Sequence, residues 1–190
     1  MQAEMEAPLE FRRHILKDDS AKREVQRNMD KFSPFFSYIV AFIIVSLVMF
    51  IPSGTMDSVK SPWYKCIRPT ITPPNYVFPI VWTILYILIA IALANTLMLP
   101  NSSNRQILLW LFGFNLICNM LWSFAYFGNK DVLLAFFILL AIIITTGFIL
   151  QYLYLLLPIW VMILLIPYQL WICFAGILNF LSLFKKCKPK

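Results

Sequence analysis

The sequence predicts an all-α membrane protein, a bundle of five transmembrane helices with a long ordered first loop. Of its 190 residues 61% are hydrophobic and only 13% are charged, and the mean hydropathy is +0.76. A soluble domain is about 45–50% apolar and about 25% charged. The charges also gather at the ends of the chain, where 14 precede Phe32 and four lysines follow Phe184. The nearly uncharged middle is what a bilayer requires.

The two ends of the chain are interpreted as tails. Residues 1–31 carry seven basic and seven acidic residues without an apolar run, which fits neither a secretory signal peptide nor a mitochondrial transit peptide. Residues 185–190 form a basic tail, which we interpret as a cytoplasmic topology anchor, with an anionic-lipid site as the alternative. The net charge of +7 comes without a nucleic-acid-reading motif, so we expect no nucleic-acid partner.

The transmembrane domain spans residues 32–184 and divides at prolines and turn residues. From Val132 to Phe184 the chain has 53 residues without a charge. One helix of that length would measure about 80 Å, against a hydrocarbon core of about 30 Å, so it must turn back at Pro158. Pro167 is expected to kink or loosen the last span. The predicted spans cover about residues 32–51, 79–99, 107–127, 132–154 and 159–184.

The connection between the first two spans has 27 residues, 52–78, whereas most connections have about 4–6. Its prolines, Pro62, Pro69, Pro73 and Pro74, remove backbone donors and push the preceding residues toward extended conformations. We therefore expect the connection to be stiff, without regular helix from Ser61 onward, and to act as a lid over a binding site. Stiffness would reduce the entropy lost when the lid closes on a ligand.

Three spans carry polar and aromatic side chains at helical spacing, which places them on one face of each helix. Two interpretations stay open at this point. The side chains could hold the helices together or lie in interfacial belts, or they could line a shared interior cavity. The faces consist of Trp82 and Tyr86; of Asn115, Asn119 and Trp122; and of Tyr168, Trp171, Ala175 and Asn179, with Phe174 and Leu178 beside them.

Ordinary catalytic chemistry finds no support. Outside the N-terminal tail the acids are Asp57 and Asp131, both in loops, and no span carries a charge. A proton relay, a phosphate loop and a catalytic triad are therefore absent from the sequence pattern. We predict no cofactor and no metal site, and we interpret the four cysteines, which lack CxxC spacing, as small hydrophobic residues and not as a redox framework.

A set of residues in fixed order closely resembles the pattern of the translocator protein family, also called the peripheral benzodiazepine receptor or tryptophan-rich sensory protein family. The likeness covers about residues 36–184. It rests on Trp63-Tyr64, Arg68-Pro69, Pro73-Pro74, Val81-Trp82-Thr83, Leu85-Tyr86, Asn115-Leu116, Asn119, Trp122, Pro167-Tyr168, Trp171, Phe174-Ala175 and Leu178-Asn179.

The resemblance implies a five-helix receptor or carrier that binds porphyrins, and in animal members cholesterol and benzodiazepine-like ligands, in a pocket under the first loop. Indole faces could stack on a porphyrin, while Lys65 and Arg68 could pair its carboxylates. Some members degrade protoporphyrin in light, which makes Trp82 and Trp171 candidates for photo-oxidation. The expected ligand-binding residues are Lys65, Arg68, Pro73, Pro74, Trp82, Tyr86, Asn119, Trp122, Trp171, Phe174, Ala175, Leu178 and Asn179.

The chain departs from the family pattern at several positions. Ile71 replaces a loop tryptophan, and Phe180 stands where the cholesterol-recognition pattern has a tyrosine. Trp110 and Phe114 replace the small residues of a dimer contact, although a homodimer stays a candidate assembly. The mitochondrial outer membrane follows from animal members, with endoplasmic reticulum and Golgi membranes as alternatives. A light-dependent enzyme and a scaffold that acts through its tails are the alternative functions.

Overall fold

The computed structural model describes residues 34–185, and in this part of the chain every regular element is a helix. Five helices are long and apolar enough to cross a membrane, which confirms the five-helix bundle and makes the chain a multi-pass integral membrane protein. They are Pro34–Thr55, α3 (Val77–Leu97), Ser103–Gly128, α5 (Val132–Leu156) and α6 (Ile159–Leu183). The third combines α4 (Ser103–Ser123) with the π-helical turn η2 (Phe124–Gly128). The predicted tail 1–31 and nearly all of the tail 185–190 lie outside the described residues.

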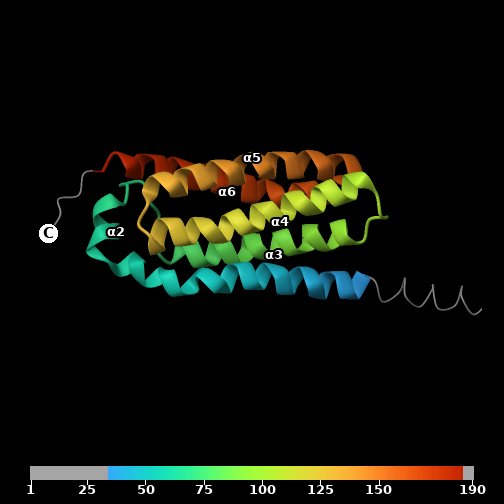
Figure 1. Ribbon diagram of the computed structural model, residues 1–190, viewed down its shortest axis with the longest axis horizontal. Coiled ribbons are helices and arrows are strands. Elements are labelled where there is room, and N and C mark those ends of the chain that lie inside the picture. Colours follow the sequence, from blue (N-terminus) through green and yellow to red (C-terminus); the bar gives the residue numbers. More distant parts are fainter. Residues whose placement is uncertain (1–33, 186–190) are drawn as a thin grey trace, which may run out of the picture.

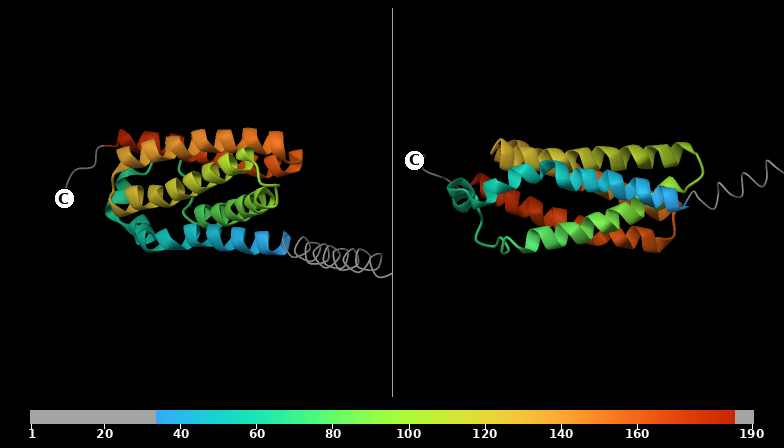
Figure 2. Two further views of the ribbon diagram at one scale, coloured as in Figure 1. Left: turned by 45° about the vertical axis from the view of Figure 1, so that its right-hand side comes forward. Right: turned by 90° about the horizontal axis from the view of Figure 1, so that it is seen from below.

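The five spans run along the long axis of the molecule, and residues 34 and 185 lie at opposite ends (Figure 1). α5 packs against both α4 and α6, and α3 packs against α6 and α4. The first span lies along one side of the bundle in Figure 1 and in the left view of Figure 2. Its small residues Ser37 and Ala41 are buried, and their spacing of four residues places them on the same face of the helix.

Polar side chains and prolines define the helix ends. Asp131 caps α5, since its Oδ1 accepts from the backbone N–H of Leu134 at 2.9 Å. Ser102 caps α4 in the same way, through the N–H of Arg105 at 3.2 Å. Pro158 separates α5 from α6, whereas α6 continues through Pro167 as one element.

The first loop is ordered, but our expectation that it lacks regular helix from Ser61 onward is wrong at Pro62–Ile67. It contains a 3₁₀ helix, η1 (Ile51–Lys60), and a short α-helix, α2 (Pro62–Ile67). Pro62 begins α2, where its missing N–H costs no hydrogen bond, and the Ser61 hydroxyl accepts from the N–H of Tyr64 at 3.2 Å. Residues 68–76 alone connect α2 to α3 without regular helix.

The cysteines also need one correction. Cys118 and Cys173 lie in the spans as free thiols, which fits the prediction. Cys66 in α2 is disulfide-bonded, so it is not simply a small hydrophobic residue. Spacing could not reveal this bond, because the pairing of distant cysteines depends on the fold.

Candidate functional site

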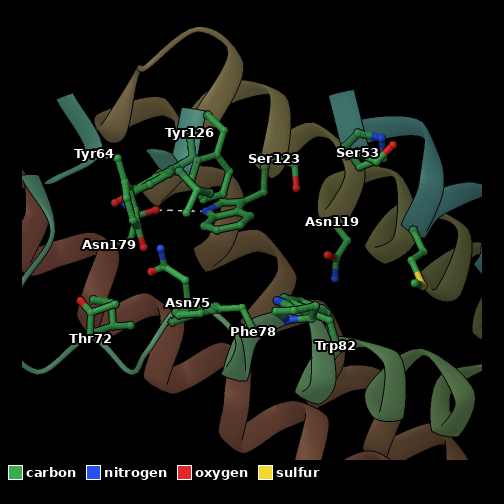
Figure 3. A pocket seen from close by; sticks show the side chains of 18 of the residues that line it. Ser53, Tyr64, Thr72, Asn75, Phe78, Trp82, Asn119, Ser123, Tyr126 and Asn179 are labelled. Carbon is green, nitrogen blue, oxygen red and sulfur yellow. Dashed lines mark hydrogen bonds between the residues drawn. The ribbon is translucent and has the colours of Figure 1, made fainter. Parts of the chain in front are cut away.

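A cavity of about 530 Å³ lies between the first loop and the inner faces of α3, α4 and α6. This volume falls within the range of about 300–1,000 Å³ that small-molecule sites occupy. Figure 3 shows Asn75 and Phe78 facing Asn119, Tyr126 and Asn179 across it. The cavity is lined by Met49, Phe50, Pro52, Ser53, Val59, Lys60, Tyr64, Pro69, Thr72, Asn75, Phe78, Pro79, Trp82, Tyr86, Asn119, Trp122, Ser123, Tyr126, Phe127, Trp171, Ala175, Leu178 and Asn179.

Most of the expected ligand-binding residues on the helices meet in this cavity. They come from three helices and share the helical faces that their spacing predicts. The residues brought together are Trp82 and Tyr86 of α3, Asn119 and Trp122 of α4, and Trp171, Ala175, Leu178 and Asn179 of α6.

The other expected residues do not line the cavity. Phe174 lies in a separate groove of α3 and α6, together with Pro167 and Leu170. Lys65 is exposed on α2, and Pro73 and Pro74 flank lining positions without lining the cavity themselves.

Arg68 is engaged within the loop. Its guanidinium donates to the Asn75 side-chain oxygen at 3.2 Å and to the backbone oxygens of Thr72 and Pro73 at 3.1 and 3.2 Å. These bonds hold together the segment that has no regular structure. Arg68 therefore fixes the shape of the lid, and its donors point into the loop.

Several lining residues were missed by the sequence reasoning. Tyr126 lies four residues after Trp122 and extends the same helical face, with its ring stacked on that indole at 5.3 Å between centroids. Helical spacing could therefore have found it. Lys60 and Thr72 lie in the loop, where no periodicity marks the side chains that point inward. Tyr64 is also a lining residue; burial raises its pKa, and the nearby Arg68 partly lowers it, so the phenol stays protonated at neutral pH.

The floor of the cavity rests on a chain of hydrogen bonds that joins four helices. Tyr86 Oη donates to Asn119 Oδ1 at 3.3 Å, and Asn119 Nδ2 donates to Tyr168 Oη at 2.7 Å. Tyr168 Oη donates in turn to Asn115 Oδ1 at 2.8 Å. Asn115 Nδ2 contacts Thr145 Oγ1, Thr146 Oγ1 and the Ile142 carbonyl at 2.8, 2.9 and 3.0 Å. Asn115 therefore only joins helices through hydrogen bonds, whereas Asn119 both joins helices and lines the cavity.

The side chains around the cavity differ in whether their polar atoms are paired. Trp122 Nε1 donates to Asn179 Oδ1 at 3.0 Å, and Asn179 Nδ2 donates to the Val132 carbonyl at 2.9 Å. Trp171 Nε1 and Thr72 Oγ1 are buried without a partner. A buried polar atom without a partner is costly, so these two atoms are the ones that a ligand could satisfy.

The arrangement favours binding over acid–base catalysis. Lys60 is the one charged residue among the lining residues that the structure describes. In the part of the chain that the structure describes, no group of His, Cys, Asp or Glu could hold a metal ion.

Comparison with known proteins agrees with this architecture. The model of the TspO/MBR family matches residues 39–183. The chain belongs to this family. It is similar to the tryptophan-rich protein TspO of Chlorobaculum tepidum, with 34% identity over 67% of this chain and 82% of that protein. It is also similar to the proteins of the same name from Archaeoglobus fulgidus, with 35% identity over 66% and 80%, and from Bacillus cereus, with 32% identity over 75% and 92%.

Proposed function

We propose that the protein is a membrane receptor or carrier for flat hydrophobic molecules, porphyrins first among them, and that they bind in the cavity under the first loop. The observation that carries the proposal is the meeting of three indoles, Trp82, Trp122 and Trp171, from three different helices around one cavity of about 530 Å³.

Flat aromatic walls select flat ligands. Indole and phenol rings stack on planar π-systems, and each ring can bury a large area. Trp82 stands against Tyr86 at 5.3 Å between centroids, and Trp122 against Tyr126 at the same distance, so two aromatic pairs line the cavity. Sterols and benzodiazepine-like molecules are further candidate ligands, since most of the lining is apolar.

A titration of the purified full-length protein with protoporphyrin IX in darkness tests the proposal. We expect saturable tryptophan quenching together with a shift of the porphyrin absorption band. Trp82→Ala should weaken binding at least about tenfold, because it removes a stacking wall. Trp110→Ala is the matched control, since that indole is 79% exposed on α4, outside the cavity. Absence of saturable binding by the unaltered protein would refute the proposed function.

A light-dependent enzyme that consumes protoporphyrin is the second candidate, favoured by the position of Trp82 and Trp171 in the cavity wall. Illumination of the protein–porphyrin complex should then cause pigment loss beyond that of free porphyrin. Trp82→Phe and Trp171→Phe should abolish this loss while binding in darkness persists. Equal loss with all three proteins would exclude an enzymatic role for these indoles.

The scaffold function depends on a part of the chain outside the described residues, and the organelle is inferred from the resemblance to animal members of the family. A scaffold role through the tail predicts that deletion of residues 1–31 abolishes function with porphyrin affinity unchanged. The mitochondrial outer membrane stays the favoured location, with endoplasmic reticulum and Golgi membranes as alternatives, and fractionation of membranes would decide between them. A homodimer is tested by the mass of the detergent-solubilised protein.

A further inference from the structure

The polar groups of the cavity divide between its floor and its loop side, and the two sides offer a ligand different chemistry. The floor is formed by Tyr86 and Asn119 from the helices. The loop side is formed by Lys60, Thr72 and Asn75. The two sides should therefore accept different edges of a bound ligand, an inference that rests on the proposed function above.

The direction of the hydrogen bonds in the floor is set by a backbone carbonyl. The Ile142 oxygen can only accept, so it faces the amide nitrogen of Asn115, and Asn115 Oδ1 must face Tyr168. Tyr168 then donates to Asn115 and accepts from Asn119 Nδ2, which turns Asn119 Oδ1 toward Tyr86.

This chain determines what the floor can give a ligand. Tyr86 Oη donates its hydrogen to Asn119 Oδ1, so toward the cavity it can act only as a hydrogen-bond acceptor. Asn119 keeps one N–H beyond its bond to Tyr168. Tyr86 and Asn119 thus offer no cation and at most one amide donor, and Trp171 Nε1 on α6 adds one neutral N–H, so the helix side suits a neutral group better than a carboxylate.

The loop side is rich in donors that have no acceptor. Thr72 is 8% exposed, and its hydroxyl is buried without a partner. The side-chain oxygen of Asn75 already accepts from Arg68, which leaves its amide nitrogen, and Figure 3 shows that side chain projecting from the loop into the cavity. Lys60 supplies the positive charge: it lines the cavity from the end of η1, and its side chain is exposed.

We propose that Lys60, with Thr72 and Asn75, forms an oxyanion subsite, so that the cavity takes planar apolar molecules that carry a carboxylate on one edge and holds that edge toward the loop. Carboxylates prefer charged and neutral N–H and O–H donors together. Lys65 and Arg68, which the sequence suggested for this role, are excluded by position: Lys65 does not line the cavity, and Arg68 is engaged by the loop.

Protoporphyrin IX and its dimethyl ester test the subsite, because the two share the ring and differ in charge. The full-length protein should bind the acid more tightly than the ester. Lys60→Gln should weaken binding of the acid about fivefold and leave the ester unchanged. Thr72→Val, which keeps the shape and removes the hydroxyl, should weaken the acid about threefold and the ester less.

Lys65→Gln is the matched control, since it removes the same charge five residues away, outside the cavity. If Lys65→Gln weakens acid binding as much as Lys60→Gln, the effect is general attraction by a basic loop and the subsite is refuted. Equal affinity of the unaltered protein for acid and ester, with no effect of Lys60→Gln, also refutes the subsite while the proposed function stands. Failure of the unaltered protein to bind either compound refutes both.

Discussion

The floor and the loop side of the cavity differ in whether their polar side chains have hydrogen-bond partners within the protein. In the floor, the side chains of Asn115, Asn119 and Tyr168 bond to one another and to α5. On the loop side, the hydroxyl of Thr72 is buried without a partner among the described side chains, and Lys60 is exposed. A buried polar group without a partner is costly, so on the loop side this cost falls on Thr72.

The difference separates side chains that build the bundle from those that await a ligand. A paired polar group contributes to stability whether or not a ligand is present. A buried unpaired group lowers stability by its desolvation free energy until a ligand supplies the hydrogen-bond partner. Substitutions in the floor should therefore change unfolding first, and substitutions on the loop side should change affinity first.

The largest expected effect is at Asn115, which does not line the cavity. Asn115→Leu removes the acceptor of Tyr168 and the donor of the α5 contacts, so we expect a loss of about 2–3 kcal/mol in stability. Thermal unfolding in detergent, followed by near-ultraviolet circular dichroism, measures it. Asn104→Leu, at an exposed position in the first turn of α4, is the control. An unfolding midpoint for Asn115→Leu equal to that of the control would show that the chain does not hold the helices together.

A second effect is expected at Arg68, on the loop side. Arg68→Met removes the three bonds that shape residues 68–76, so the loop must be ordered when the ligand binds, and affinity for porphyrin acid and ester should both fall about tenfold. The unfolding midpoint should barely change. Isothermal titration gives the affinities, and hydrogen exchange should report faster opening of the loop. Loss of acid binding alone would instead mean that Arg68 contacts the carboxylate.

The smallest effect compares two indoles of the same cavity. Trp122→Phe leaves Asn179 Oδ1 without its donor and should lower stability by about 1 kcal/mol. Trp171→Phe removes an N–H that has no partner, so it should leave the unfolding midpoint unchanged or slightly raised. Chemical unfolding of the two variants side by side measures the difference. Equal destabilisation would contradict the distinction between paired and unpaired groups.

The sequence predicted which side chains of the helices face the cavity, with few exceptions. Asn115, Asn119 and Trp122 share one face of α4, and the spacing of 3.6 residues per turn that placed them there also points to Tyr126. Phe174 was the exception on α6. It follows Trp171 by three residues and was expected beside the inner face, but that indole itself lies at the boundary between the cavity and the outer groove.

The sequence by itself determined the five spans, their division at Pro158, the ordered first loop and the inward faces of three helices, because regular helices convert residue spacing directly into direction. Only the tertiary structure decided that Lys60 and not Lys65 reaches the cavity, and that Arg68 donates to the loop. These residues lie in or next to a short 3₁₀ helix, a one-and-a-half-turn α-helix and a segment without regular structure. In such a segment a side chain points where packing against the bundle places it, and no period along the chain records that direction.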